Sequence, residues 1–182
     1  NNQSFRVRAH PFTIPGTIVE LMVYIESESG FRDTTTFSFE LSQPEVTDPF
    51  GPDDYGYVCF DDGDVDWEMA PVYDWIEIDP DEQEDFRGTN TNLRDGGDNQ
   101  DESMVVDLPF EFMYYGEVFN QLTISTSGWA AFGDWEDLSD FRNRRIASGG
   151  GPNAQLCVFW DNLSTGRIFY HYDEDGAQFI VE

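Results

Sequence analysis

Hydrophobic and polar positions alternate most regularly in LPFEFMYYGEVFNQLTISTSGWAAFG, residues 108–133. The run 110–114 has the two-residue period of a strand with one buried face. A second run, 119–125, follows a glycine turn, and a third, 129–132, follows a Ser-Gly pair. The pattern predicts three consecutive antiparallel strands, a meander at the centre of a β-sheet.

Shorter runs of similar pattern flank this meander on both sides. They lie at 5–8, 18–25, 36–41, 57–60, 72–78, 156–160, 166–172 and 178–181. Turn residues such as Pro15-Gly16 and Ser29-Gly30 separate them, and no stretch of any length has helical periodicity. Short strands at regular spacing predict an all-β protein with an antiparallel β-sandwich.

Three regions differ in composition. Residues 1–42 predict the C-terminal strands of an immunoglobulin-like β-domain, because so few strands cannot bury both of their faces alone. The proline-rich stretch 43–52 predicts a linker, and residues 53–182 predict the β-sandwich module. The sequence ends inside a strand-like run, AQFIVE, so we expect a module truncated at its C-terminus and belonging to a longer polypeptide.

Charge narrows the range of partners. The 182 residues include 37 Asp and Glu against 9 basic residues, all of them arginine, for a formal net charge of -28. Such a field repels phosphate backbones and anionic headgroups, so no nucleic acid partner is expected. No apolar run approaches the length of about 18 residues that spans a bilayer, so no membrane insertion is expected. Bound divalent metals, high salt and simple solubility remain three open explanations of the acidity.

Six sequence segments occur in an order that is typical of a known type of domain. They are DPFGPDDYGYVCFDDGD, APVYDWIEI, LPFEFMYYGEVFNQLTISTSGWAAFG, FRNRRI, GPNAQLCVFWDNL and FIVE. Residues 48–182 resemble the β-sandwich module that accompanies gingipain-like cysteine peptidases in large secreted bacterial proteins. The later part is also similar to the nidogen-type extracellular domain. Ser127 stands where that pattern has Asn, and Asn162 where it has a second Asp, so no ligand site is carried over to those two loops.

The two cysteines are candidates for a disulfide rather than for catalysis. A cysteine nucleophile needs a nearby oriented histidine, yet Cys59 and Cys157 both lie inside apolar strand-like runs. The resemblance implies small residues at both positions, so two cysteines there suggest facing partners. A Cys59–Cys157 disulfide would close a loop of about 100 residues and stabilise by about 4 kcal/mol. The alternative is two buried free thiols.

Acidic loops are candidates for calcium, which prefers clustered hard oxygen ligands. The first cluster consists of Asp61, Asp62, Asp64 and Asp66, and Asp48, Asp53 and Asp54 just upstream are candidates to complete the shell. The second consists of Asp95, Asp98 and Asp101. Neither has the spacing of an EF-hand. The alternative is that these carboxylates are merely solvated.

Aromatic residues leave a third possibility open, a platform on which a sugar stacks. Trp75, Trp129 and Trp160 lie in strand-like runs and are expected to be buried, whereas Trp67 and Trp135 lie in acidic loops and are expected to be exposed.

The function that follows is a non-catalytic, calcium-stabilised structural or adhesive module of a larger secreted or cell-surface protein. Its expected partners are other domains of the same chain and protein or glycan ligands. The alternatives are an accessory domain of a secreted gingipain-like cysteine peptidase and a carbohydrate-binding module.

Overall fold

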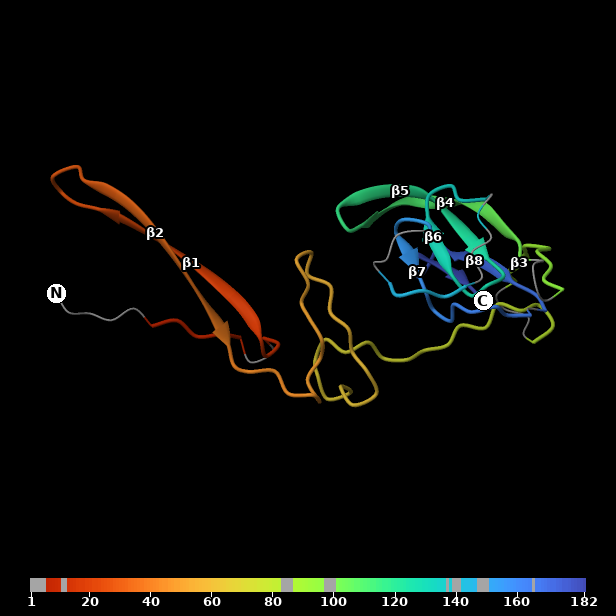
Figure 1. Ribbon diagram of the computed structural model, residues 1–182, viewed down its shortest axis with the longest axis horizontal. Helices are drawn as coiled ribbons and strands as arrows, with labels where there is room; N and C mark the ends of the chain where they lie inside the picture. Colours follow the sequence, from red (N-terminus) through yellow and green to blue (C-terminus); the bar gives the residue numbers. More distant parts are fainter. Residues whose placement is uncertain are drawn as a thin grey trace. The chain divides into compact units, whose positions relative to one another are not determined.

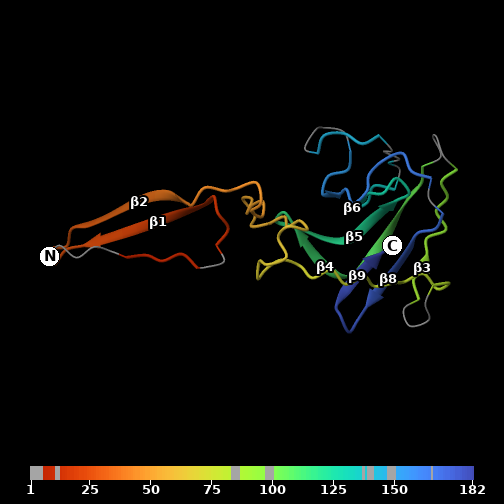
Figure 2. The ribbon, with the colours of Figure 1, turned by 90° about the horizontal axis from the view of Figure 1, so that it is seen from below.

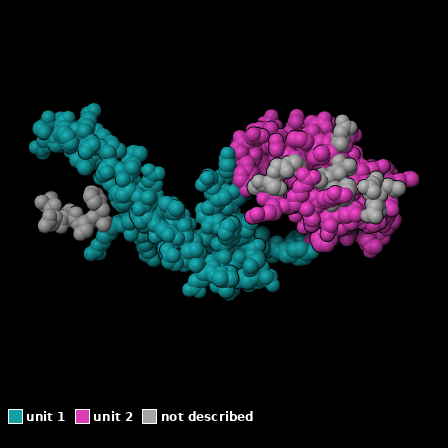
Figure 3. Space-filling model, in the orientation of Figure 1, with its two compact units in different colours: residues 1–74 teal, residues 75–182 magenta. Residues whose placement is uncertain are grey.

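A computed structural model describes residues 6–10, 13–82, 87–96, 101–136, 138, 142–146, 151–164 and 166–182. Across these residues all regular structure is β-strand, arranged in three antiparallel sheets without a helix (Figure 1). The predicted all-β fold is therefore confirmed. The chain divides into two units, Asn1–Asp74 and Trp75–Glu182 (Figure 3). The domain boundaries drawn from the sequence stay predictions.

Unit 1 contains a two-stranded ribbon of β1 (Thr17–Glu26) and β2 (Arg32–Leu41). Gly30 adopts a φ of 86°, a left-handed conformation that lets the connecting turn close. The register sets Val19 opposite Phe39 and Leu21 opposite Phe37, so one face of the ribbon is apolar. The predicted strands 18–25 and 36–41 are confirmed.

Outside the ribbon, the described residues of unit 1 form hardly any β-sheet hydrogen bonds. The strand predicted at 57–60 is reduced to one bridge between Phe50 and Cys59, and that prediction was wrong. Carboxylates compete here for the backbone, because Asp53 Oδ1 accepts the N–H groups of both Tyr55 and Tyr57 at 2.9 Å. The strand predicted at 72–78 is also absent.

The larger sheet of unit 2 has the order β4-β5-β6-β7. Its strands are β4 (Ser103–Tyr114), β5 (Glu117–Ser125), β6 (Ala130–Phe132) and β7 (Gln155–Leu156). The first three are neighbours in chain order, which confirms the predicted meander. Tyr115 and Gly116, with φ of 47° and 80°, make the tight turn between β4 and β5. The register shifts between Asp107 and Phe112, where Pro109 has no N–H to donate.

The smaller sheet has the order β3-β8-β9. Its strands are β3 (Thr89–Asn90), β8 (Phe169–Asp173) and β9 (Gln178–Val181). The strand predicted at 178–181 is confirmed. The one predicted at 166–172 starts three residues later than expected, and the one at 156–160 is reduced to the two residues of β7.

Side chains from both sheets form one core, which makes unit 2 a sandwich. Figure 2 shows the backbone of these strands from a second direction. Its buried members are Val106, Leu108, Leu122, Ile124, Phe132 and Ile168. Tyr170 of β8 and Phe179 of β9 pack against them from the smaller sheet. The core therefore depends on both layers.

Four contacts attach residues 78–81 to residues that flank the strands of the smaller sheet. The buried Ile78 donates its N–H to Glu182 Oε2 at 2.9 Å, and its carbonyl accepts the N–H of Gly88 at 2.8 Å. Arg167 forks onto the carboxylates of Asp79 and Asp81.

Candidate functional site

The loop Asp61–Asp66 carries four carboxylates in unit 1, and one of them is buried. Asp64 is only 3% exposed, whereas Asp61, Asp62 and Asp66 are exposed. Asp64 Oδ2 accepts the N–H of Asp61 at 2.9 Å, and Asp61 Oδ1 accepts the N–H of Gly63 at 2.7 Å. The Asp64 carboxyl is thus turned back into the loop.

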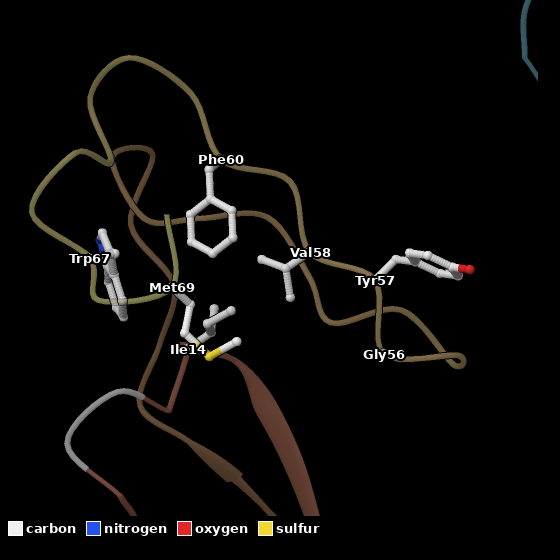
Figure 4. A pocket seen from close by; sticks show the side chains of 7 residues that line it. All are labelled: Ile14, Gly56, Tyr57, Val58, Phe60, Trp67 and Met69. Atoms are coloured by element: carbon white, nitrogen blue, oxygen red, sulfur yellow. The ribbon is translucent and has the colours of Figure 1, made fainter. Parts of the chain in front are cut away.

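The acidic loop joins two walls of an apolar cavity of about 250 Å³ (Figure 4). The cavity is lined by Ile14, Gly56, Tyr57, Val58, Phe60, Trp67 and Met69. Figure 4 shows Phe60, Val58 and Met69 directed at a common space, while the Tyr57 ring points away from it. Phe60 immediately precedes the loop, and Trp67 follows it and donates its backbone N–H to Asp64 O at 2.9 Å. The conformation of the loop therefore sets the distance between these walls.

Asp48 and Asp53 serve turns upstream of the loop. Asp48 Oδ2 accepts the N–H of Glu45 at 2.7 Å. Asp53 organises the turn that the Phe50–Cys59 bridge closes. The structure gives both carboxylates a local backbone role.

In unit 2, four of the five side chains at 123–127 are buried hydroxyls, at the end of β5 or directly after it. Thr123, Ser125, Thr126 and Ser127 are each no more than 3% exposed. Ser127 Oγ donates to Asp101 Oδ1 at 2.8 Å, and Thr126 Oγ1 accepts the N–H of Glu102 at 3.0 Å. Asp101, predicted as a metal ligand, is thus engaged with a buried hydroxyl.

Backbone hydrogen bonds join this loop to residues 159–163. Gly128 O accepts the N–H of Phe159 at 3.0 Å, and Ser127 O accepts the N–H of Asp161 at 3.2 Å. Gly128 has a φ of 72°, and a Cβ at this position would clash with the Phe159 carbonyl. A glycine is therefore required for the two loops to approach this closely.

Beside these loops lies an open cavity of about 390 Å³. It is lined by Asn143, Arg144, Ile146, Cys157, Val158, Phe159, Trp160 and Asp161. Partial burial raises the pKa of the Cys157 thiol, so less of the reactive thiolate forms near neutral pH.

A family model described as NIDO related matches residues 82–177, more than half of the chain. The chain belongs to the NIDO-related family. The matched range includes the loop that carries Thr126 and Ser127, the segment 159–163 that is bonded to it, and every strand from β3 to β8. It confirms the nidogen-like part of the resemblance. No curated protein and no solved structure matches the chain.

Membership of the NIDO-related family indicates an extracellular structural module of a non-catalytic kind. No helix long and apolar enough to cross a membrane occurs in the part of the chain that the structure describes.

The two calcium sites expected from the acidic loops stay predictions. Within the described ranges, no three side chains of Asp, Glu, His or Cys are gathered in a way that could hold a metal ion. In the second predicted cluster, Asp95 is buried, Asp101 bonds Ser127, and Asp98 lies outside the described residues.

The tryptophans differ from the prediction at every position but Trp129; Trp160, expected to be buried, is half-buried. Trp129 is buried as expected, but Trp75 is 57% exposed, because the segment around it joins no sheet. Trp67 and Trp135 are half-buried. The Trp135 indole donates to Phe132 O at 3.1 Å, which fixes that ring against the sheet, whereas Trp67 lines the apolar cavity.

The structure shows no disulfide between Cys59, which is exposed in unit 1, and Cys157, which is half-buried in unit 2, and the predicted disulfide stays a prediction. If the two cysteines pair, the native protein has no alkylatable thiol under non-reducing denaturation and gains the mass of two hydrogens on reduction. A Cys59→Ser variant is the control and should expose one reactive thiol. Two thiols alkylated in the unreduced wild-type protein would contradict the pairing.

Proposed function

We propose that the chain is a non-catalytic, calcium-stabilised structural and adhesive module of a larger secreted or cell-surface protein. The observation that carries this proposal is the family match, which falls on the two-sheet sandwich of unit 2. Extracellular fluid supplies calcium at concentrations where weak sites fill, so stabilisation by calcium suits this location.

The use of polar groups in unit 2 supports a structural role. The buried Thr123, Thr126 and Ser127 hydroxyls all bond neighbouring segments of the chain. Groups committed to such bonds join loops and are not presented to a substrate. The buried hydroxyl side chains at 123–127 thus favour a structural role for this region over a catalytic one.

The ribbon of unit 1 supports the adhesive part. Phe37 and Ile25 are exposed on its apolar face, and Ile18 (73% exposed) and Met22 (71% exposed) lie on the other. A two-stranded ribbon is marginally stable alone, so a further β-layer packed on these side chains would stabilise it. This arrangement is consistent with the predicted strands of an immunoglobulin-like domain.

Two alternatives differ in what accompanies or binds the module. An accessory domain of a gingipain-like peptidase requires a Cys-His catalytic domain in the same polypeptide. Carbohydrate binding draws support from Trp67, whose indole lines an open apolar cavity beside acidic groups. Loss of glycan binding in Trp67→Ala, but not in Trp75→Ala, would favour the carbohydrate alternative.

The proposal predicts where the native polypeptide is found and how large it is. An antibody against residues 1–182 should detect it in the medium or on intact cells by surface biotinylation. Its denatured mass should lie well above 20.9 kDa. A cytoplasmic enzyme probed on the same blots is the control for lysis. Recovery only from the cytoplasm, at a mass near 20.9 kDa, would overturn the proposal.

A further inference from the structure

A three-residue acceptor pattern lies in unit 2 at residues 162–164, Asn162-Leu163-Ser164. An asparagine followed two positions later by serine or threonine, with no proline between them, is the sequence to which oligosaccharides are attached in secreted proteins. Of the other asparagines in the chain, only Asn2 is followed by a hydroxyl residue at this spacing, and residues 2–4 lie outside the described part of the structure.

The structural context decides whether such a short pattern is usable, since the attached group is bulky and polar and needs a surface segment. Asn162 and Ser164 are both exposed, and the segment lies between β7 and β8, outside any strand. Asp161 shapes the turn, because its Oδ1 accepts the N–H of Asn162 at 2.8 Å and its carbonyl accepts the N–H of Leu163 at 3.0 Å. A large group on Asn162 would therefore extend into water without displacing the core.

The residue between the two exposed ones faces the protein. Leu163 is half-buried, and a Cβ at Gly128 would lie only 2.8 Å from Leu163 Cδ1. The leucine thus attaches the turn to the loop that contains Gly128, while its two neighbours remain exposed to solvent.

Exposed apolar side chains precede the acceptor asparagine. Val158 and Phe159 are 87% and 72% exposed, and with Ile146 they line the open cavity of about 390 Å³. Contiguous exposed apolar surface favours association or aggregation unless something covers it. Phe159 precedes Asn162 by three residues, and an aromatic ring offers a flat apolar face against which a sugar ring can stack.

From these observations we infer that Asn162 is a site of N-linked glycosylation and that the glycan shields Phe159 and Val158. The inference rests on the extracellular location in the proposed function, because chains are glycosylated at this triplet on export. In the reaction, Asn162 Nδ2 forms a bond to the anomeric carbon of an oligosaccharide carried on a lipid pyrophosphate. The bond from that carbon to the pyrophosphate oxygen breaks, the lipid pyrophosphate leaves, and the amide loses one proton.

The test analyses the native polypeptide that the antibody recovers from the medium or from the cell surface. Because the chain has no lysine, trypsin cleaves it only after arginine, and cleavage after Arg145 and Arg167 releases a peptide, 146–167, that contains the whole triplet. After reduction and alkylation, mass spectrometry of this peptide should show an added oligosaccharide, sugar fragment ions and attachment at Asn162. Finding only the bare peptide in protein recovered outside the cell would overturn the inference and leave the proposed module standing.

Variants made in the native host test the assignment to this triplet. Ser164→Ala removes the hydroxyl but keeps the acceptor amide, and it should abolish the glycosylated peptide, whereas Ser164→Thr should retain it. Asn153→Gln is the matched control, because Asn153 is exposed and lies in the same peptide but has Gln155 at the hydroxyl position. A glycan that persists in Ser164→Ala would overturn the assignment. The peptide from the wild-type protein stays decisive even where a variant fails to fold.

Shielding of the apolar side chains is measured with Asn162→Gln, which keeps an amide but is not an acceptor. The secreted variant should bind more of an uncharged apolar dye such as Nile red than Asn153→Gln does. An uncharged dye is needed because the net charge of -28 repels anionic ones. Equal dye fluorescence for the two variants would overturn the shielding of Phe159 and Val158.

Discussion

Replacing Gly128 by alanine should unfold unit 2 under conditions in which the wild-type protein is folded. A φ of 72° costs a non-glycine residue roughly 1–2 kcal/mol. The new Cβ would also clash with the Phe159 carbonyl and lie 2.8 Å from Leu163 Cδ1. Relief requires breaking the bond between Phe159 N–H and Gly128 O, so the total loss should exceed about 4 kcal/mol.

Two other glycines separate the parts of this effect. Gly166→Ala adds a Cβ with no heavy atom within 4 Å and should change stability by less than about 0.5 kcal/mol. Gly30→Ala has the positive φ but no close neighbour, so it should cost only about 1 kcal/mol, in the ribbon. Urea unfolding followed by far-ultraviolet circular dichroism measures all three. Coincident midpoints for Gly128→Ala and Gly166→Ala would show that the close approach of the loops is unimportant.

The parts of the fold that the sequence predicted well are those where one face of a strand is buried. Alternation in β4 and β5 reflects a core on one side only, and the turn at Tyr115-Gly116 announces the reversal between them. The run 72–78 alternates just as well, yet neither it nor the continuous apolar run 57–60 becomes a strand. Alternation shows only that a segment could place apolar and polar side chains on opposite faces of a strand. A strand also requires a neighbouring segment with which to form hydrogen bonds.

Prediction of the candidate sites from the sequence was limited in a similar way, because the sequence does not show which side chains are buried. Aspartate spacing singled out the loop Asp61–Asp66, but it could not separate the buried Asp64 from the exposed Asp62 and Asp66. Burial depends on how the loop folds back, which a list of carboxylates does not encode. The buried hydroxyl row was missed entirely. Its available signal was the dense run of hydroxyl residues in TISTSGW, since such a run inside a sheet requires partners across loops.

The position of Trp75 has a related cause. It was expected in the core because it alternates with polar neighbours, whereas its indole is largely exposed and donates to Glu77 Oε2 at 3.3 Å. The chain enters the sandwich only at Ile78, which is fully buried. A difference of three residues therefore decides which apolar side chain is in the core.

Truncation of Phe132 to alanine should destabilise unit 2 by about 3–5 kcal/mol. This ring is buried in β6 and stacks on Phe112 at 4.7 Å between centroids, with Tyr114 at 5.1 Å and Phe119 at 5.5 Å. Its removal leaves a cavity bordered by three aromatic rings from β4 and β5. The urea midpoint and the melting temperature should both fall.

Phe159→Ala is the matched control, because it deletes the same atoms from a side chain that is 72% exposed and leaves the backbone bond to Gly128 intact. It should shift stability by less than about 0.5 kcal/mol. A double-mutant cycle with Phe112→Ala measures the stacked pair, and a coupling of about 0.5–1.5 kcal/mol is expected. Equal losses for Phe132→Ala and Phe159→Ala would mean that β6 does not contribute to the core as its contacts indicate. A full loss for Phe132→Ala without coupling to Phe112 would assign the effect to burial alone, because stacking between two rings requires both of them.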